Sequence, residues 1–218
     1  MKKQQETPRA IAERAKKVVT LLRKTYPEAK TSLEHETPLQ LLISTILSAQ
    51  CTDVRVNMVT PALFDRYKTA GDFAEADRGE LESYIRSINF YQNKAKNIIA
   101  SAQAIVERHG GEVPRSMEEL TALAGVGRKT ANCVLGAGFG IPSGVVVDTH
   151  VARLTQRLGL TLETDPVRIE RDLNEIVPKR SWIFFSHALI LHGRAICTAR
   201  APKCPECIFK AFCPSAQL

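Results

Sequence analysis

Apolar residues recur every three or four positions along most of this chain, which is the spacing of one face of an α-helix. The stripes are clearest over residues 11–22, 39–47 and 95–106. The one compact run of β-branched residues, 145–147, is short enough to indicate an isolated extended segment rather than a strand of a sheet. Helix start signals, in which a capping residue precedes a proline or a glutamate-rich turn, stand at Thr7, Thr37, Ser116 and Asp165. The pattern predicts an all-α fold.

Two further segments depart from this amphipathic pattern. Residues 182–191 are apolar around most of the helical circumference, which predicts a buried helix with His187 and His192 inside it or at its edges. Residues 136–144 are rich in turn-forming glycine, and this stretch is a candidate crossing between domains.

Size and charge narrow the class of protein. A chain of 218 residues suits one large domain or two small ones. The 30 Lys and Arg outnumber the 23 Asp and Glu and give a net charge of +7, so a polyanion is the natural partner to test. The longest apolar run, 39–47, is far shorter than the roughly 20 residues of a membrane span, and no apolar stretch near the start resembles a signal peptide. We therefore expect no membrane association.

Four of the six cysteines lie close together near the end of the sequence. Thiolates at such spacing can bind a zinc ion or an iron–sulfur cluster, and the spacing alone does not choose between them. Two disulfides or unpaired thiols are the less favoured alternative, because the four cysteines are tightly clustered and no signal peptide is expected. Those two, Cys51 and Cys133, are expected to be small buried side chains. The four candidate ligands are Cys197, Cys204, Cys207 and Cys213.

A glycine-containing hairpin joins two predicted helices around residue 126. Gly125 and Gly127 allow a positive φ and a close approach of another backbone, and amides at the start of the second helix can face a phosphate. Lys129 lies in the first turn of that helix, where the positive end of the helix dipole favours the neutral amine. A neutral lysine amine is a nucleophile that forms Schiff bases, although an ordinary solvated lysine is the simpler reading of its position alone.

Several motifs stand in register along nearly the whole chain: 47–53, 88–95, the hairpin 123–131, the Val-Asp-Thr-His at 147–150, and the four-cysteine tail. Together they resemble the endonuclease III family of helix-hairpin-helix DNA glycosylases. The resemblance implies a bifunctional DNA glycosylase and abasic-site lyase of base excision repair. Its substrates would be oxidised or ring-saturated pyrimidines, or abasic sites, in double-stranded DNA.

The resemblance also implies catalytic roles. Lys129 would attack the sugar carbon that bears the damaged base, and the resulting imine would permit β-elimination and nick the strand. Asp148 would be the supporting carboxylate. Since Asp148 precedes a predicted helix, it is also a candidate N-cap, and one residue can do both.

The family pattern nominates two residues that fill the gap left by an extruded nucleotide, Gln50 and Phe90. The family commonly has leucine where this chain has Phe90, and packing of Phe90 in the core is the alternative. Asn89 stands where glycine is usual, and Ala124 replaces a proline often found in the hairpin.

For the four cysteines the resemblance favours a 4Fe-4S cluster with a structural role. His150 either contacts DNA or caps its own helix. Lys94, Lys96, Arg128 and Arg153 are weaker phosphate candidates, and a solvated surface charge is the equal alternative for each. The remaining residues expected to contact DNA are Gly125, Gly127, Arg128, Arg200 and Lys203.

The implied architecture is a six-helix barrel domain over 31–140 and a discontinuous iron–sulfur domain formed by 1–30 and 141–218, with the cluster loop at 197–213 and the active cleft between the domains. Family precedent is a monomer. In a bacterium or archaeon, the protein is expected in the cytoplasm in association with the nucleoid. In a eukaryote, it is expected in the nucleus or an organelle.

Two alternatives remain open. A monofunctional adenine glycosylase would need a catalytic carboxylate on the first barrel helix, but residues 39–50 contain no Asp or Glu. A non-enzymatic DNA-binding module with a structural zinc explains the charge, the hairpin and the cysteines, but it leaves Lys129 and Asp148 unexplained.

Overall fold

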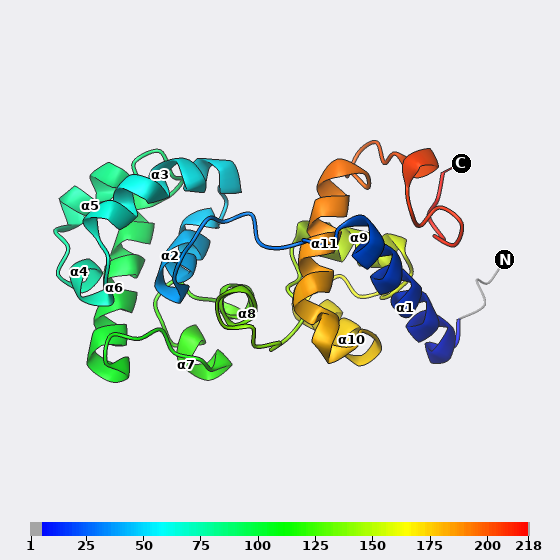
Figure 1. Cartoon of the computed structure of the whole chain (residues 1–218), viewed down its shortest axis with the longest axis horizontal. Helices are drawn as coiled ribbons and strands as arrows, with labels where there is room; N and C mark the ends of the chain where they lie inside the picture. Colours follow the sequence, from blue (N-terminus) through cyan, green and yellow to red (C-terminus); the bar gives the residue numbers. More distant parts are fainter. Residues whose placement is uncertain (1–5, 218) are drawn as a thin grey trace. The chain divides into compact units, whose positions relative to one another are not determined.

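Every regular element between residues 6 and 217, the part of the chain that the computed structural model describes, is helical (Figure 1). The predicted all-α fold is therefore confirmed, and residues 145–147 are extended without pairing into a sheet. The α-helices are α1 (Pro8–Thr25), α2 (Pro38–Ser48), α3 (Asp53–Arg66), α4 (Ala70–Ala74), α5 (Arg78–Tyr84), α6 (Tyr91–His109), α7 (Met117–Thr121), α8 (Arg128–Cys133), α9 (Thr149–Arg157), α10 (Pro166–Ile176) and α11 (Trp182–Ala195).

Three shorter helical pieces complete the described chain. A π-helical stretch, η1 (Val134–Gly138), continues α8 directly. Two 3₁₀ turns are η2 (Lys179–Ser181), which leads into α11, and η3 (Cys204–Glu206), which lies in the cysteine-rich tail.

The predicted helix starts are present as caps. Thr7, Thr37 and Ser116 each accept a hydrogen bond from the backbone N–H three residues ahead, at 3.2–3.3 Å. Asp165 accepts two such bonds at the start of α10. Because a cap depends on neighbours in sequence, these boundaries follow from local chemistry.

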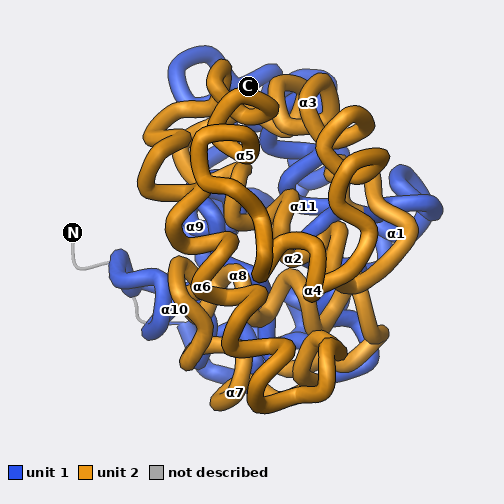
Figure 2. The backbone as a smooth tube through the Cα atoms, turned by 90° about the vertical axis from the view of Figure 1, so that its left-hand side faces the viewer, with its two compact units in different colours: residues 1–30, 144–218 blue, residues 31–143 orange. Residues whose placement is uncertain are grey.

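The chain divides into two compact units, coloured separately in Figure 2. Unit 2 is the continuous segment Thr31–Ser143 and holds α2 to α8 with η1. Unit 1 combines Met1–Lys30 with Gly144–Leu218, so α1 packs with α10 and α11 although the whole of unit 2 separates them in sequence.

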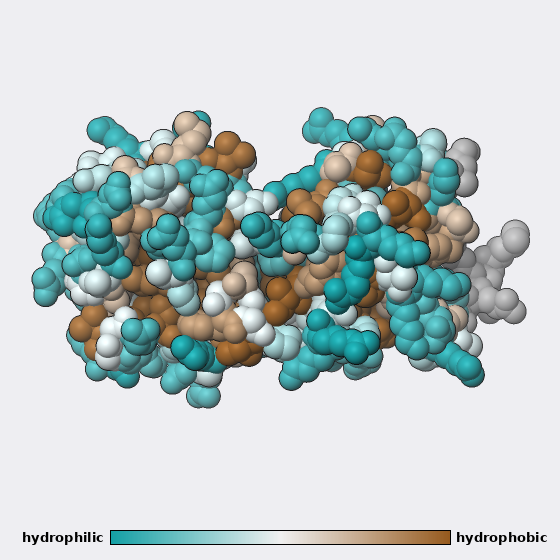
Figure 3. Space-filling view, in the orientation of Figure 1, coloured by the Kyte–Doolittle hydropathy of each residue, from teal (hydrophilic) through white to brown (hydrophobic). Residues whose placement is uncertain are grey.

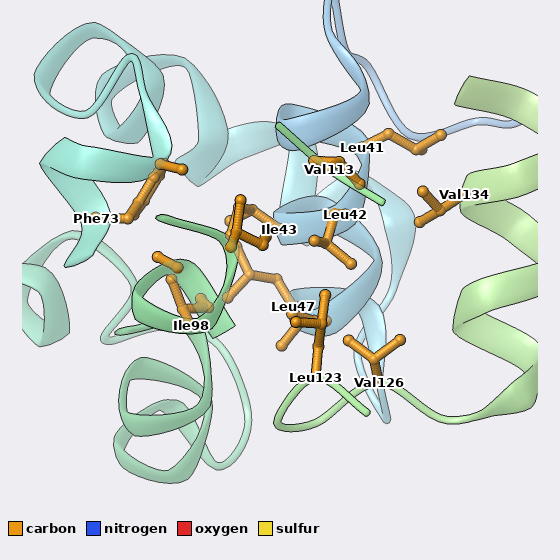
Figure 4. Close-up of a cluster of buried hydrophobic side chains, with 14 of the residues drawn as sticks. Leu41, Leu42, Ile43, Leu47, Phe73, Ile98, Val113, Leu123, Val126 and Val134 are labelled. Atoms are coloured by element: carbon orange, nitrogen blue, oxygen red, sulfur yellow. The ribbon is translucent and has the colours of Figure 1, made fainter. Parts of the chain in front are cut away.

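Helix α2 lies at the centre of unit 2. It packs against α3, α6, α8 and η1, and its residues Leu41, Leu42 and Leu47 are fully buried. Figure 4 shows these α2 side chains among hydrophobic residues contributed by α4, α6, the hairpin and η1. Those neighbours are Phe73, Ile98, Leu123, Val126 and Val134.

Unit 1 has its own core, built on α9 and α11, with α1 packed against both α10 and α11. The predicted burial of the apolar helix α11 is confirmed: Phe185, Ala188 and Leu189 are fully buried, and His192 is 1% exposed. On the face drawn in Figure 3, hydrophilic residues predominate over the surface of each unit. No described helix is long and apolar enough to cross a membrane.

Candidate active site

Two buried residues, Leu123 and Val126, anchor the hairpin between α7 and α8. Gly125 has φ +73°, and a Cβ at this position would lie 2.8 Å from the side-chain nitrogen of Asn97. Gly127 differs: its φ is −90°, and a Cβ would meet nothing within 4 Å. The sequence-based expectation of a positive φ is therefore right for Gly125 and wrong for Gly127, whose backbone any residue can adopt.

Lys129 and Arg128 form the first turn of α8, and both are exposed. The helix that carries them packs on α2 and continues into η1, whose Val134 and Leu135 are buried. These packing contacts fix the backbone of Lys129 against the core of unit 2, and the side-chain amine of Lys129 is exposed to solvent. An exposed amine at the start of a firmly packed helix is available to a substrate.

Gln50 and Phe90 are the two non-glycine residues with positive φ among those described, at +53° and +57°. Both are exposed, Phe90 by 62%. The alternative in which Phe90 packs in the core is therefore wrong. A large aromatic side chain held out in solvent is available for contact with a partner.

A surface pocket lies beside Gln50, with an empty volume of about 610 Å³. Cys51, one of its lining residues, is half-buried, as is Cys133 elsewhere in unit 2. The sequence-based expectation that both cysteines are buried is thus only partly right. The pocket is lined by Gln50, Cys51, Thr52, Arg55, Ser87 and Asn89.

Lys94 is buried, which overturns its candidacy as a phosphate contact. Its ammonium donates to the carbonyl oxygens of Leu47, at 2.8 Å, and Ala49, at 2.5 Å. Burial lowers the pKa of Lys94, and the two carbonyl bonds satisfy its donors. The lysine thus closes the last turn of α2 rather than facing solvent.

Asp148 is the N-cap of α9. One carboxylate oxygen, Oδ1, accepts from the N–H groups of His150 and Val151, each at 2.8 Å. The capping role considered from the sequence is thus confirmed, and the half-buried carboxylate has a second oxygen with capacity to accept a proton.

His150 and Arg153 lie one turn apart on α9 and interact, with Arg153 Nη2 3.1 Å from His150 Nδ1. Arg153 also donates to the carbonyls of Gly193 and Cys197. Arg153 therefore holds the end of α11 while staying half-buried, and its role as a weaker phosphate candidate stays a prediction.

The four cysteines of the tail line one cavity in unit 1, and none forms a disulfide. Burial raises the pKa of the Cys207 and Cys213 thiols. The charges of other cysteines of the set raise it further. No three His, Cys, Asp or Glu side chains within residues 6–217 converge as a single metal ion requires.

Two residues that sequence reasoning did not assign hold this cavity. Arg157 Nη1 donates to Cys197 Sγ at 3.2 Å and to the carbonyl of Thr198 at 2.7 Å. His192 Nε2 lies 3.3 Å from Cys207 Sγ, and its Nδ1 lies 3.0 Å from the Tyr26 hydroxyl. Burial lowers the pKa of His192 to about 4, so the ring is neutral near pH 7.

Arg200 and Lys203 are both exposed, on the loop between Cys197 and Cys204. The carbonyls of Thr198 and Ala199 in this loop accept hydrogen bonds from Arg157. The loop therefore carries two exposed cations, and the hydrogen bonds from Arg157 on α9 hold its backbone in place.

Comparison with known proteins places this geometry in a family. Residues 43–179 match the model of the HhH-GPD superfamily of base excision DNA repair proteins. The chain is 58% identical to the endonuclease III of Synechocystis sp. over 94% of each chain, and 45% identical to that of Bacillus subtilis over 88% of each. A solved structure of a trapped endonuclease III–DNA covalent intermediate superposes with a TM-score of 0.88, at 41% identity, over 94% of this chain and 96% of that one.

The fold and the hairpin thus define a base excision repair protein of the helix-hairpin-helix class. The chain belongs to the HhH-GPD superfamily and, within it, to the endonuclease III family, a family of DNA glycosylases with abasic-site lyase activity.

Gly125 provides a test of the hairpin geometry. We expect Gly125→Ala to lower the free energy of unfolding by about 1–3 kcal/mol, because the new methyl group combines a left-handed backbone with a clash against Asn97. Urea denaturation measures this change. Gly127→Ala is the matched control and should change stability by about 0.5 kcal/mol or less. Equal losses in both variants would contradict the geometry.

Proposed function

We propose that this chain excises oxidised or ring-saturated pyrimidines from double-stranded DNA and then nicks the strand, with Lys129 as nucleophile. The observation that carries the proposal is the placement of Lys129, an exposed amine in the first turn of α8 directly after the glycine hairpin. The covalent protein–DNA intermediate trapped for a relative supports a nucleophilic mechanism.

The reaction begins when the Lys129 amine attacks C1′ of the damaged nucleotide. The C1′–N bond breaks, the base leaves with the bonding electrons and takes up a proton, and the sugar ring opens to give an imine. Loss of a proton from C2′ then expels the 3′ phosphate. Asp148 accepts the proton that the Lys129 nitrogen loses as it bonds to C1′, and it stabilises positive charge at the sugar.

Attack at C1′ requires that the nucleotide leave the base stack. Gln50 and Phe90, both exposed on unit 2, fill the space that it vacates. The Gln50 amide can bond to the orphaned base, and the Phe90 ring can wedge between base steps. Cations position the duplex through its phosphates, and we assign this task to Arg128, Arg200 and Lys203, with the hairpin amides and His150.

For the cysteine cavity we propose a 4Fe-4S cluster bound by the four tail cysteines. When bound, such a cluster supplies a rigid cross-link between distant parts of the tail. Unit 2 would then be the barrel domain, and unit 1 the cluster domain that presents Arg200 and Lys203.

Borohydride trapping tests the nucleophile. On a duplex with one thymine glycol, we expect the native protein to form a trapped adduct and Lys129→Ala to form none and to release no base, because the imine needs the amine. Lys68→Ala, another exposed lysine of unit 2, is the control and should trap normally. Base release by the native protein without an adduct would instead indicate a monofunctional glycosylase.

Asp148→Asn separates catalysis from capping. Asparagine caps helices as well as aspartate, so stability should hold. Loss of the carboxylate should slow single-turnover base release about a hundredfold or more. Asp165→Asn, which alters an equivalent cap on α10, should leave the rate unchanged. Similar rates for both variants would limit Asp148 to its structural role.

Metal analysis tests the cofactor. The native protein should contain about four irons and four acid-labile sulfides per chain. Cys207→Ser should lose most of both, whereas Cys51→Ser, which changes a cysteine of unit 2 that does not line the cavity, should keep them. One zinc per chain without sulfide would contradict the proposal.

A further inference from the structure

Two exposed residues with the same unusual backbone conformation stand on neighbouring segments of unit 2. Gln50 follows α2, and Phe90 precedes α6, and both have left-handed backbones that non-glycine residues rarely adopt. Such conformations persist only where surrounding contacts hold them. The contacts that hold these two residues are therefore informative.

Three hydrogen bonds run from the Phe90 segment to the end of α2. The Asn89 side-chain amide donates to the Gln50 carbonyl at 2.6 Å. From the other side of Phe90, Lys94 donates to the carbonyls of Leu47 and Ala49. All three acceptors lie within four residues of one another, at the turn where α2 ends.

The donors of these hydrogen bonds differ in their surroundings. Gln50 and Asn89 both line a surface pocket. Lys94 is 6% exposed and therefore shielded from water, whereas Asn89 is exposed. Lys94 thus fixes the end of α2 from within, and Asn89 fixes Gln50 itself at the surface.

We propose that Asn89 is a positioning residue that, with Lys94, holds Gln50 in its left-handed conformation and in a fixed relation to Phe90. The inference rests on the proposed function, in which Gln50 and Phe90 enter the duplex around the extruded nucleotide. Because Gln50 is held in place before DNA binds, less conformational freedom is lost when its amide meets the orphaned base. Asn89 contacts neither the sugar nor the leaving base and acts through Gln50.

Single-turnover base release from a thymine glycol duplex tests this role. We expect Asn89→Ala to slow release by roughly five- to tenfold through loss of one hydrogen bond. Strand cleavage at a preformed abasic site, which has no base to extrude, should be affected less. Gln103→Ala is the matched control, because Gln103 is an exposed amide of α6 that also donates to a backbone carbonyl, that of Ala74.

A double-mutant cycle shows whether Asn89 acts through Gln50. Gln50→Ala keeps the carbonyl that Asn89 binds and removes only the side chain being positioned. We expect Asn89→Ala to add no further slowing in the Gln50→Ala background. If the two effects multiply, or if Asn89→Ala releases base at the native rate, the positioning role is refuted.

Hydrogen–deuterium exchange on the DNA-free protein gives a readout independent of activity. Asn89→Ala should speed exchange in peptides covering residues 48–53, and Gln103→Ala should not. Unchanged exchange at 48–53 would also refute the inference. A native protein that releases no base would refute the proposed function, while this measurement would still decide whether Asn89 holds Gln50.

Discussion

Burial of α2 in the core of unit 2 is the constraint on which the arrangement of this unit depends. Because α2 is apolar around most of its circumference, it needs covering helices on several sides, and α3, α6, α8 and η1 provide them. The same contacts place the functional residues: Gln50 follows the end of α2, Phe90 precedes α6, and Lys129 lies on α8. One buried helix thus fixes the backbones of three exposed residues.

Several basic side chains serve the interior rather than the surface. Lys94 satisfies carbonyls at the end of α2, Arg153 does so at the end of α11, and Arg14 does so just after α9. Arg157 likewise holds the backbone of the cysteine loop. Helix C-termini leave unpaired carbonyls, and a cation is a strong donor for them. The count of 30 Lys and Arg therefore overstates the number of cations available to a phosphate backbone.

Sequence reasoning succeeded where the signal was local. Helix starts such as Thr37 and the burial of α11 followed from caps and apolar spacing within a few residues. It failed for Lys94, because a lysine is seldom buried and its partner carbonyls lie 45 and 47 residues away. It also missed Asn89, whose bond to Gln50 spans 39 residues. Tertiary contacts of this kind leave no periodic trace in a sequence.

The division of the chain has a consequence for its synthesis on the ribosome. Unit 2 is continuous, so it can fold as soon as it has emerged. Helix α1 is made earlier, yet the buried face that carries Val18 and Leu22 must wait for α10 and α11. At about 5–20 residues per second, this delay is on the order of ten seconds. During that interval the nascent chain carries a helix whose apolar face is uncovered, and a chaperone can shield that face. Folding of unit 1 is complete only after its cysteine-rich tail has been translated.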